Sequence, residues 1–401
     1  MKFSVKFIFN ICTIYIILWG LYGFHWYDSA KGTNIDAWSN IFLGINMAIS
    51  ILILFNLKKI KSIFFRGVNI LLLTFVLYGF FYVIGGDTHF MHGHAVNKAS
   101  YLIGILRSYL PLYAFYYFTK RGYLNQNSIT LYFVILFAFS LLYNLFYSQY
   151  WVSIGYDNGF TNNLGYVFVS FFPFVFLYKQ KSLLQYIILA CIVGLTLTSM
   201  KRGAIVISFF LFLWFLRTNL SHIKTSKRFI ILLMTFVLLT IGYLYINHLY
   251  DSSSFFQTRM EQTMEGASSG RDVLYTRLID HFWNGSGALQ QLFGSGPDST
   301  LDILGKEAHN DWLEILICQG LFGVSIFAFF WFNSYKYWKQ MPKNTVYNQI
   351  VGAFLLTQFL RTFFSMSYST IPTAATLILG YALAKSEMEI KIKNIQIRNR
   401  N

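Results

Sequence analysis

Residues Ser268–Gly323 read SSGRDVLYTRLIDHFWNGSGALQQLFGSGPDSTLDILGKEAHNDWLEILICQGLFG, and this stretch decides how the chain is organised. It belongs to the only long polar interruption of an otherwise apolar sequence. It holds two arginines, two histidines and several carboxylates, which are side chains that bind anions and transfer protons. We therefore expect the residues that carry the chemistry of the protein in this stretch, and we expect the apolar remainder to form the scaffold that holds them.

The apolar remainder has the composition of a polytopic membrane protein. Of the 401 residues, 55% are hydrophobic and 12% are charged, whereas soluble proteins carry about 25% charged residues. Runs of about twenty apolar residues recur, and such runs cross a bilayer as helices. We expect an all-α protein with about twelve transmembrane helices. The expected spans are Lys6–Tyr27, Trp38–Leu57, Gly67–Gly85, Ala99–Phe118, Ile129–Phe146, Leu164–Tyr178, Leu183–Ser199, Gly203–Leu216, Phe229–Leu249, Trp312–Phe332, Val346–Phe364 and Ile371–Ala384.

The charge distribution predicts the orientation. An even number of spans puts both termini on one side, and 22 of the 32 Lys and Arg residues fall on that side. Because basic residues are retained in the cytoplasm, we expect both termini there. The net charge of +16 then reflects topology and anionic lipids, and no nucleic-acid partner is expected. The predicted division is transmembrane residues 1–249, a periplasmic loop at 250–311, transmembrane residues 312–384 and a cytoplasmic tail at 385–401.

The long external loop has its own helical pattern. Leu274, Leu278 and Phe282 recur at helical spacing after a Ser-Ser-Gly start, which predicts an amphipathic helix near Arg271–Trp283. A glycine-rich connection follows, and then a short helix is expected near Ser299–Leu304.

Two arginines lie inside apolar spans, where a charge is costly and marks a candidate functional group. Arg107 is in mid-span and is followed by Pro111, so we expect the helix to break there and line a cavity. On this interpretation Arg107 binds an anion in the cavity. The alternative is that its side chain snorkels to the membrane surface or forms a structural ion pair. Arg361 lies near the external end of its span and is interpreted as an interfacial anchor.

Other cations lie next to expected helix starts. Lys201 and Arg202 belong to the shortest external connection and directly precede a helix, whose N-terminal amides favour a bound phosphate. Arg271 opens the loop helix in the same way. Arg277 cannot share its helical face, so we expect one of the two to face the membrane helices and the other to face solvent. We favour Arg271 for the anion.

His309 precedes the tenth expected span, with Asn310 or Asp311 as its N-cap. The helix dipole at this place opposes protonation, and a neutral imidazole is suited to act as a general base. Glu307, Asp311 or Glu314 is expected to orient its other nitrogen. On spacing alone, an interfacial capping histidine is the alternative.

A metal site is a weaker interpretation. Asp87, His89, His92 and His94 fall within eight residues and are possible zinc ligands, but no scaffold that would fix their geometry is evident. The three cysteines lie in apolar spans and predict neither a disulfide framework nor a metal site. We expect no metal and no other cofactor.

Three motifs in order, with this topology, resemble the O-antigen ligase and O-antigen polymerase superfamily. The first is Thr198–Gly203, which resembles the family's Ser-Arg-Gly element but has Met200 and Lys201 between the serine and the arginine. The second is Ser269-Gly270-Arg271 at the loop helix. The third is Phe293–Pro297 followed by Ala308-His309-Asn310, with ten residues between the histidine and Gly320. The resemblance covers roughly residues 164–323.

The resemblance implies a GT-C-like glycosyltransferase of the bacterial inner membrane with a periplasmic active site. The implied donor is a glycan on undecaprenyl diphosphate, and the acceptor is another glycan or lipid A core. It implies Arg202 and Arg271 as ligands of the diphosphate, with Arg107 and Arg277 as second choices and Lys201 in support. His309 would act as base in an inverting, metal-independent transfer. A flippase and a chain-length regulator are further implied partners.

Several functions stay open. A polymerase that extends a lipid-linked glycan by repeat units is favoured, because such enzymes are numerous and diverse. A ligase that transfers the finished chain shares its donor and chemistry and differs in the acceptor. A lipid-linked sugar flippase is disfavoured, since related halves and several midplane acids are not found. A metal-dependent glycosyltransferase would resemble its relatives in a large first external loop, whereas here that loop is only Asp28–Ala37.

Overall fold

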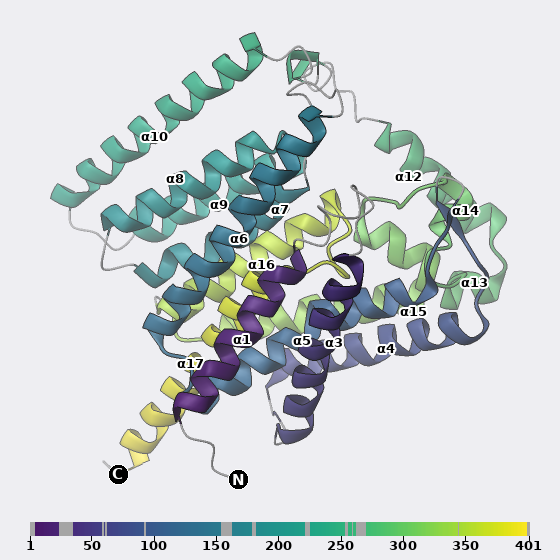
Figure 1. The fold of residues 1–401 in the computed structure, drawn as a ribbon, viewed down its shortest axis with the longest axis horizontal. Coiled ribbons are helices and arrows are strands. Elements are labelled where there is room, and N and C mark those ends of the chain that lie inside the picture. The colour runs from purple at the N-terminus through teal and green to yellow at the C-terminus, as the bar shows by residue number, and fades with distance from the viewer. Residues whose placement is uncertain are drawn as a thin grey trace.

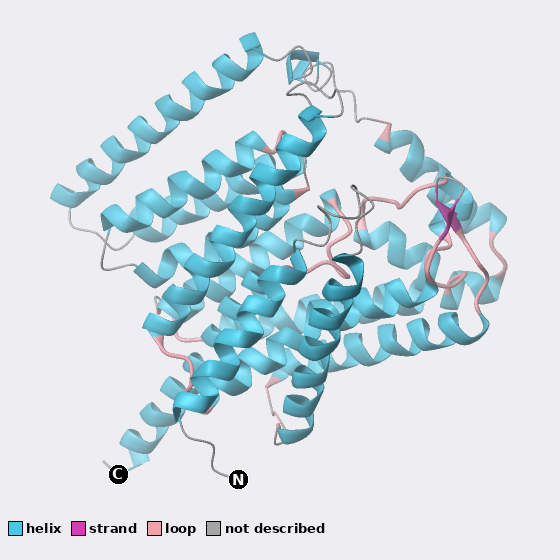
Figure 2. Ribbon diagram, viewed as in Figure 1, coloured by secondary structure: helices cyan, strands magenta, loops and turns pink. Residues whose placement is uncertain are grey.

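The computed structural model of the protein describes residues 5–23, 35–57, 60, 62–91, 94–153, 163–178, 182–220, 225–252, 256–258, 260–261, 270–343 and 345–398. This described part is built almost wholly from helices (Figure 2). The one sheet within it is a two-stranded hairpin of β1 (Phe90–Met91) and β2 (His94–Ala95), paired antiparallel with Phe90 opposite Ala95. The all-α expectation is confirmed.

Every expected span coincides with a helical segment (Figure 1). The elements are α1 Val5–Gly23, α3 Ile35–Asn56, α4 Ile63–Gly85, α5 Lys98–Lys120, α6 Gln126–Ser153, α7 Leu164–Ser170, the 3-10 helix η1 Phe172–Tyr178, α8 Ser182–Thr198, α9 Arg202–Leu220, α10 Thr225–Ser252, α12 Arg271–Asp280, the π-helical turn η2 His281–Gly285, α13 Ala288–Phe293, α14 Thr300–Leu304, α15 Asp311–Gln340, α16 Val346–Phe364 and α17 Thr373–Arg398.

Five helices of the described part are long and apolar enough to cross a membrane. They are Trp38–Asn56, Ile63–Gly85, Gln126–Phe146, Arg202–Leu220 and Asp311–Gln340. Shorter apolar helices cover Ile11–Tyr22, Leu164–Tyr178 and Leu183–Thr198. The protein is thus an α-helical membrane protein, and twelve crossings remain a prediction. The last expected span and the tail form one helix, because α17 continues to Arg398.

Two prolines affect their helices differently. Pro111 was expected to break its span, and this is wrong: α5 continues through it. Nearly every residue of α5 around the proline is buried, and α5 packs against α17, α4 and α3. That packing outweighs the loss of one helical hydrogen bond. Pro173 does interrupt its span, which changes from α7 to the 3-10 helix η1 at Phe171.

The tenth expected span is not continuous. Inside α15, Gly320 has φ 67° and ψ −166°, so the helix is broken one third of the way along. The segment after α13 fills the break: the Ser295 N–H donates to the Ile317 carbonyl (2.9 Å) and the Gly296 N–H donates to the Cys318 carbonyl (3.0 Å). These carbonyls therefore keep hydrogen-bond partners although the helix has lost its regular pattern.

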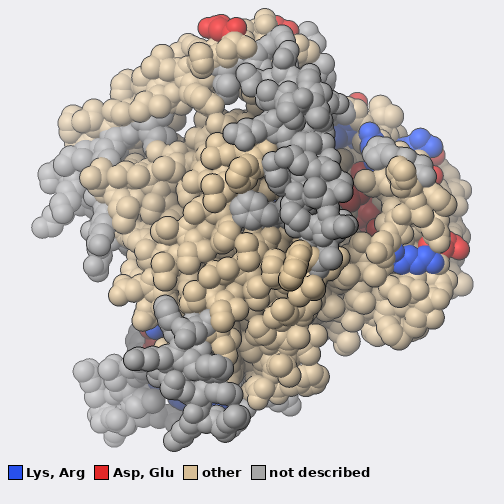
Figure 3. All heavy atoms as spheres, in the orientation of Figure 1, with Lys and Arg blue, Asp and Glu red and all other residues tan. Residues whose placement is uncertain are grey.

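We call residues 270–310, from α12 to the start of α15, the cap. The predicted helices near Arg271–Trp283 and Ser299–Leu304 are both present in it, as α12 with η2 and as α14. Leu278 and Phe282 are buried with Ala308 and Ile317, so the apolar stripe of α12 packs on the start of α15. On the face shown in Figure 3, charged side chains of the described residues gather mostly over this cap, at the right of the view.

Candidate active site

The connection between α8 and α9 forms a cationic turn beside the membrane helices. Ser199 is buried, its hydroxyl donates to the Thr196 carbonyl (2.6 Å), and it accepts from the Lys201 N–H (3.4 Å). Met200 has φ 50°, a left-handed conformation that is uncommon for a residue with a side chain. Arg202 is the first residue of the nineteen-residue helix α9. Both cations thus lie at a helix N-terminus, where the amide dipoles add positive potential.

The next residue explains why three helices meet at this turn. A Cβ on Gly203 would lie 2.3 Å from the Tyr166 hydroxyl oxygen and 2.7 Å from the Phe364 Cβ. Only glycine therefore allows the start of α9 to approach α7 and the end of α16 so closely. The Tyr166 hydroxyl donates to the Phe364 carbonyl (2.9 Å), one of the last carbonyls of α16.

Arg271 reaches the same carbonyl from the cap. Its Nη2 donates to the Phe364 carbonyl (3.3 Å), and its charge acts on both Tyr166 and Arg202. The turn after α8 and the first residue of α12 therefore bring two arginines together, although 68 residues separate them in the sequence. Two guanidinium groups at short range repel each other, and such a pair is stabilised by a shared anion.

Arg361 lies behind this pair, and its interpretation as an interfacial anchor is wrong. Its side chain is 3% exposed and stacks over the Tyr166 ring, with Cζ 5.5 Å from the ring centroid. Its Nη1 donates to the Gln358 Oε1 (3.0 Å) and its Nη2 to the Thr370 carbonyl (3.3 Å). Arg361 is therefore buried by protein, which a helix position near the membrane edge does not reveal.

His309 lies in the segment that joins the cap to α15. Its φ of 54° is left-handed, and both neighbouring residues are tied to α15. The Ala308 N–H donates to the Glu314 Oε2 (2.9 Å), and the Asn310 Oδ1 accepts from the N–H groups of Trp312 (3.0 Å) and Leu313 (3.3 Å). Asn310 is thus the N-cap, and this anchoring sustains the strained conformation of His309.

The protonation of His309 follows from its surroundings. Burial lowers the pKa of its imidazole below the usual range, and the charges of Lys201, Arg271 and Lys306 lower the pKa further. The ring is therefore neutral at physiological pH and has a lone pair available for a proton. The charges that act on His309 thus come both from the turn after α8, at Lys201, and from the start of α12, at Arg271.

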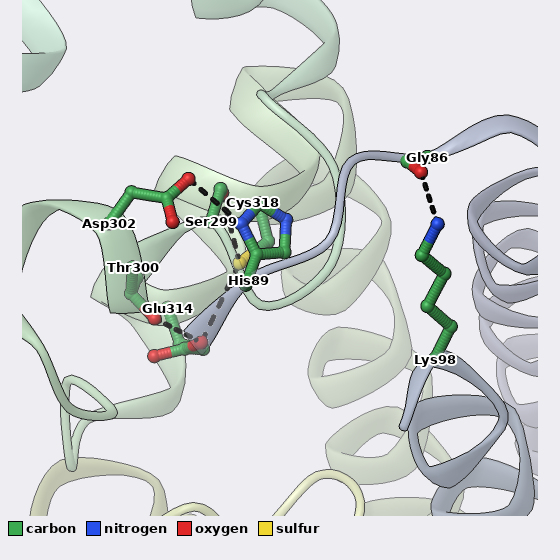
Figure 4. A network of polar contacts seen from close by, with 8 residues as sticks. All are labelled: Gly86, His89, Lys98, Ser299, Thr300, Asp302, Glu314 and Cys318. Atoms are coloured by element: carbon green, nitrogen blue, oxygen red, sulfur yellow. Dashed lines mark hydrogen bonds and ion pairs between the residues drawn. The ribbon is translucent and has the colours of Figure 1, made fainter. Parts of the chain in front are cut away.

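Two of the three carboxylates expected to orient His309 have contacts with other groups. Glu314 accepts from the Thr300 hydroxyl (2.7 Å; Figure 4). It also accepts from the Ala308 amide. Asp311 accepts hydrogen bonds from both the amide (2.7 Å) and the hydroxyl of Ser367. These two bonds join α15 to the segment after α16. Glu307 is exposed at the surface; partial desolvation raises the pKa of its carboxyl, and the nearby charge of Asp298 raises it further. Glu314 thus holds the backbone just before His309, and Asp311 ties the start of α15 to Ser367.

Other candidates lie apart from this arrangement. The Arg107 Nη1 donates to the Tyr22 hydroxyl of α1 (2.8 Å), which matches the alternative of a structural contact. Arg277 is exposed on α12 whereas Arg271 is partly buried, so the expected division between the two is confirmed. His89 is buried against Asp302, with Nδ1 and Oδ2 2.8 Å apart (Figure 4). His92 lies outside the described residues, and so does Ser269 of the second motif.

The sequence did not single out Tyr166, and it gave Arg361 another role. Tyr166 is one of 28 tyrosines and belongs to an apolar span, so no local pattern distinguishes it. Its contacts come from residues 198 positions away along the chain, at the end of α16. The signal that was available for Arg361 is its position in an apolar span, because a buried charge there needs polar partners.

Comparison with known proteins gives one family. The family model described as O-antigen ligase matches residues 184–328, which extend from α8 through the cap into α15. A search of the curated proteins gives no match. The matched residues include the cationic turn, Arg271, His309 and the break at Gly320. The resemblance to the O-antigen ligase and O-antigen polymerase superfamily that is seen in the sequence is thus confirmed over residues 184–328.

Proposed function

We propose that the protein is a glycan polymerase that joins oligosaccharide repeat units carried on undecaprenyl diphosphate at the periplasmic face of the bacterial inner membrane. The observation that carries the proposal is that Arg271 at the start of the cap reaches the Phe364 carbonyl beside the start of α9, and that burial together with the charges of Lys201 and Arg271 keeps the His309 imidazole neutral. A cationic group that binds a diphosphate, next to a base, is what glycosyl transfer from a lipid-diphosphate donor requires. Members of the matched family are glycosyltransferase-like enzymes.

Arg202 and Arg271 bind the diphosphate of the donor, and Lys201 supports them. Guanidinium groups bind phosphate oxygens through paired hydrogen bonds, and the N-terminus of α9 adds its amides. The mutual repulsion of the two arginines falls when the diphosphate binds between them and rises again when it leaves. The two arginines therefore favour the bound state of the charged leaving group. Arg107 and Arg277 stay second choices for this role, because Arg107 bonds to Tyr22 on α1 and Arg277 is exposed on α12.

His309 acts as the general base. Its neutral imidazole takes the proton of an acceptor hydroxyl, and that oxygen attacks the anomeric carbon from the side opposite the diphosphate. A new carbon–oxygen bond forms while the bond to the diphosphate breaks, and the diphosphate leaves with the electron pair and the carbon inverts. The arginines neutralise the leaving group, so the reaction needs no metal ion. Unchanged activity in the presence of EDTA is the expected result.

The ligase is the second candidate, because the matched family model is described as O-antigen ligase. Donor, cations and base would be the same, and the acceptor would be lipid A core or another acceptor. Deletion of the gene distinguishes the two. A polymerase defect leaves single repeat units, whereas a ligase defect leaves chains of normal length that are not attached. A flippase is less favoured, since the matched domain belongs to a transferase-like family.

Two substitutions test the proposal on purified protein with a lipid-diphosphate-linked repeat unit. A general base contributes about 10²–10⁴-fold, so His309→Ala should lower the rate of product formation at least about a hundredfold. Arg202→Ala should lower kcat/KM strongly, because the leaving group loses its ligand. His94→Ala and Arg121→Ala are matched controls, since His94 is exposed on β2 and Arg121 is exposed at the end of α5. Full activity of both His309→Ala and Arg202→Ala would overturn the mechanism.

A further inference from the structure

An apolar groove lies between α8 and α10, beside the cationic turn. Figure 1 shows α10 alongside α8 at the edge of the helical body. The groove has a volume of about 570 Å³ and is lined on α8 from Leu183 to Thr198 and on α10 from Leu233 to Tyr245. Its lining residues, all within the described chain, include no charged side chain. The groove is therefore suited to a hydrocarbon chain.

The groove ends where the candidate diphosphate site begins. Thr198 lines it and is the last residue of α8, and Lys201 and Arg202 follow within four residues. Its lining on α8 covers fifteen residue steps, which is about 22 Å along a helix. This length spans most of the hydrocarbon core of a bilayer, about 30 Å. A lipid with its head at the turn would thus have its tail in the groove.

We propose that this groove binds the polyprenyl chain of the diphosphate donor, which places the groove, the turn and the cap along one substrate. The inference rests on the proposed function. The expected occupant is a polyprenyl chain rather than a phospholipid acyl chain, because the groove ends at Thr198, next to a cluster of cations that suits a diphosphate. A phospholipid with a single phosphate would use that cluster incompletely.

The contribution of the groove is to place the donor rather than to extract it from lipid. Lipid tails are as apolar as the groove, so no hydrophobic driving force favours transfer of the chain into it. Shape and the attached diphosphate decide its occupancy instead. A blocked groove should therefore raise the KM for the donor and leave kcat nearly unchanged, because the reacting groups lie elsewhere.

Two glycines make the groove testable without damage to the fold. Gly194 on α8 and Gly242 on α10 line it, and a Cβ at either position meets nothing within 4 Å. Leucine at either position has an unobstructed Cβ and adds apolar volume to the groove lining, and it also replaces a poor helix former by a good one. Gly44 on α3 is a matched control, because a Cβ there also meets nothing within 4 Å and the residue lies outside the groove.

The experiment measures donor kinetics and photocrosslinking on the full-length protein in bilayer nanodiscs. For the undecaprenyl diphosphate-linked donor, Gly194→Leu and Gly242→Leu should raise KM at least about tenfold, while Gly44→Leu keeps the KM of the wild type. A diazirine-bearing polyprenyl diphosphate should cross-link to α8 and α10, and undecaprenyl diphosphate should displace it.

Two results would overturn the groove assignment: an unchanged KM in both leucine variants, or cross-links that form equally well with a diazirine-bearing phosphatidylglycerol. Failure of the proposed function has a different signature, because the wild type would then form no glycan product. In that case the cross-linking result alone decides whether the groove binds polyprenyl diphosphate.

Discussion

The interlocked glycines of the cap and α15 offer the sharpest test of how the fold holds the site. Gly320 has φ 67°, and a Cβ on it would lie 2.5 Å from the Gly294 nitrogen. Gly294 has φ 81°, and a Cβ on it would lie 2.3 Å from the Cys318 carbonyl carbon. Each glycine therefore occupies the space that a side chain on the other segment would need. We predict that Gly320→Ala separates the two segments and displaces His309, which follows the docked segment in the chain.

The cost has two parts. Alanine in a left-handed conformation costs about 1–2 kcal/mol. Relief of the clash also breaks the hydrogen bonds from Ser295 and Gly296 to the carbonyls in the break, and each contributes about 0.5–1.5 kcal/mol. Gly320→Ala should therefore cost about 2–5 kcal/mol. Gly122→Ala isolates the first part, because Gly122 has φ 78° but a Cβ there meets nothing within 4 Å.

The assay is thermal unfolding of the purified variants in detergent, followed by tryptophan fluorescence, together with glycan product formation. Gly320→Ala should unfold at a lower temperature than Gly122→Ala and lose most activity, whereas Gly122→Ala should keep it. The double variant Gly294→Ala/Gly320→Ala should cost less than the sum of the singles, since both break one contact. If Gly320→Ala is as stable and active as Gly122→Ala, the docked segment does not hold the site and the reasoning fails.

Two further predictions concern the site itself. Arg271→Gln removes a charge that lowers the pKa of His309, so the pKa rises and the acid limb of the kcat/KM profile moves to higher pH. Lys306→Gln should move the acid limb in the same direction without loss of a diphosphate ligand. An acid limb that stays in place in both variants would contradict the role of His309. Tyr166→Phe removes the hydrogen bond to the Phe364 carbonyl and should destabilise the protein by about 1 kcal/mol, raising the donor KM more than it lowers kcat; an unchanged donor KM would argue against a role at the diphosphate site.

Much of the architecture was predictable because it depends on local pattern. Apolar runs marked each helix of the body, and the spacing of Leu274, Leu278 and Phe282 predicted α12. The N-cap at Asn310 followed from its side chain and its place before an apolar run. Arg202, Arg271 and His309 were candidates because a cation or an imidazole next to a helix start has a defined electrostatic role. These properties are all determined within a few residues of sequence.

The tertiary structure alone decided which of these residues meet. Gly320 breaks α15 because a segment 25 residues earlier supplies the hydrogen bonds, and Pro111 does not break α5 because its neighbours bury it. Tyr166, Arg361 and the end of α16 come together through contacts between residues almost 200 positions apart in the chain. The sequence by itself determined a membrane body, a polar cap and the charged groups available to them. Their assembly around one site depended on packing and on distant backbone partners, which the free energy of the whole fold selects and no local pattern encodes.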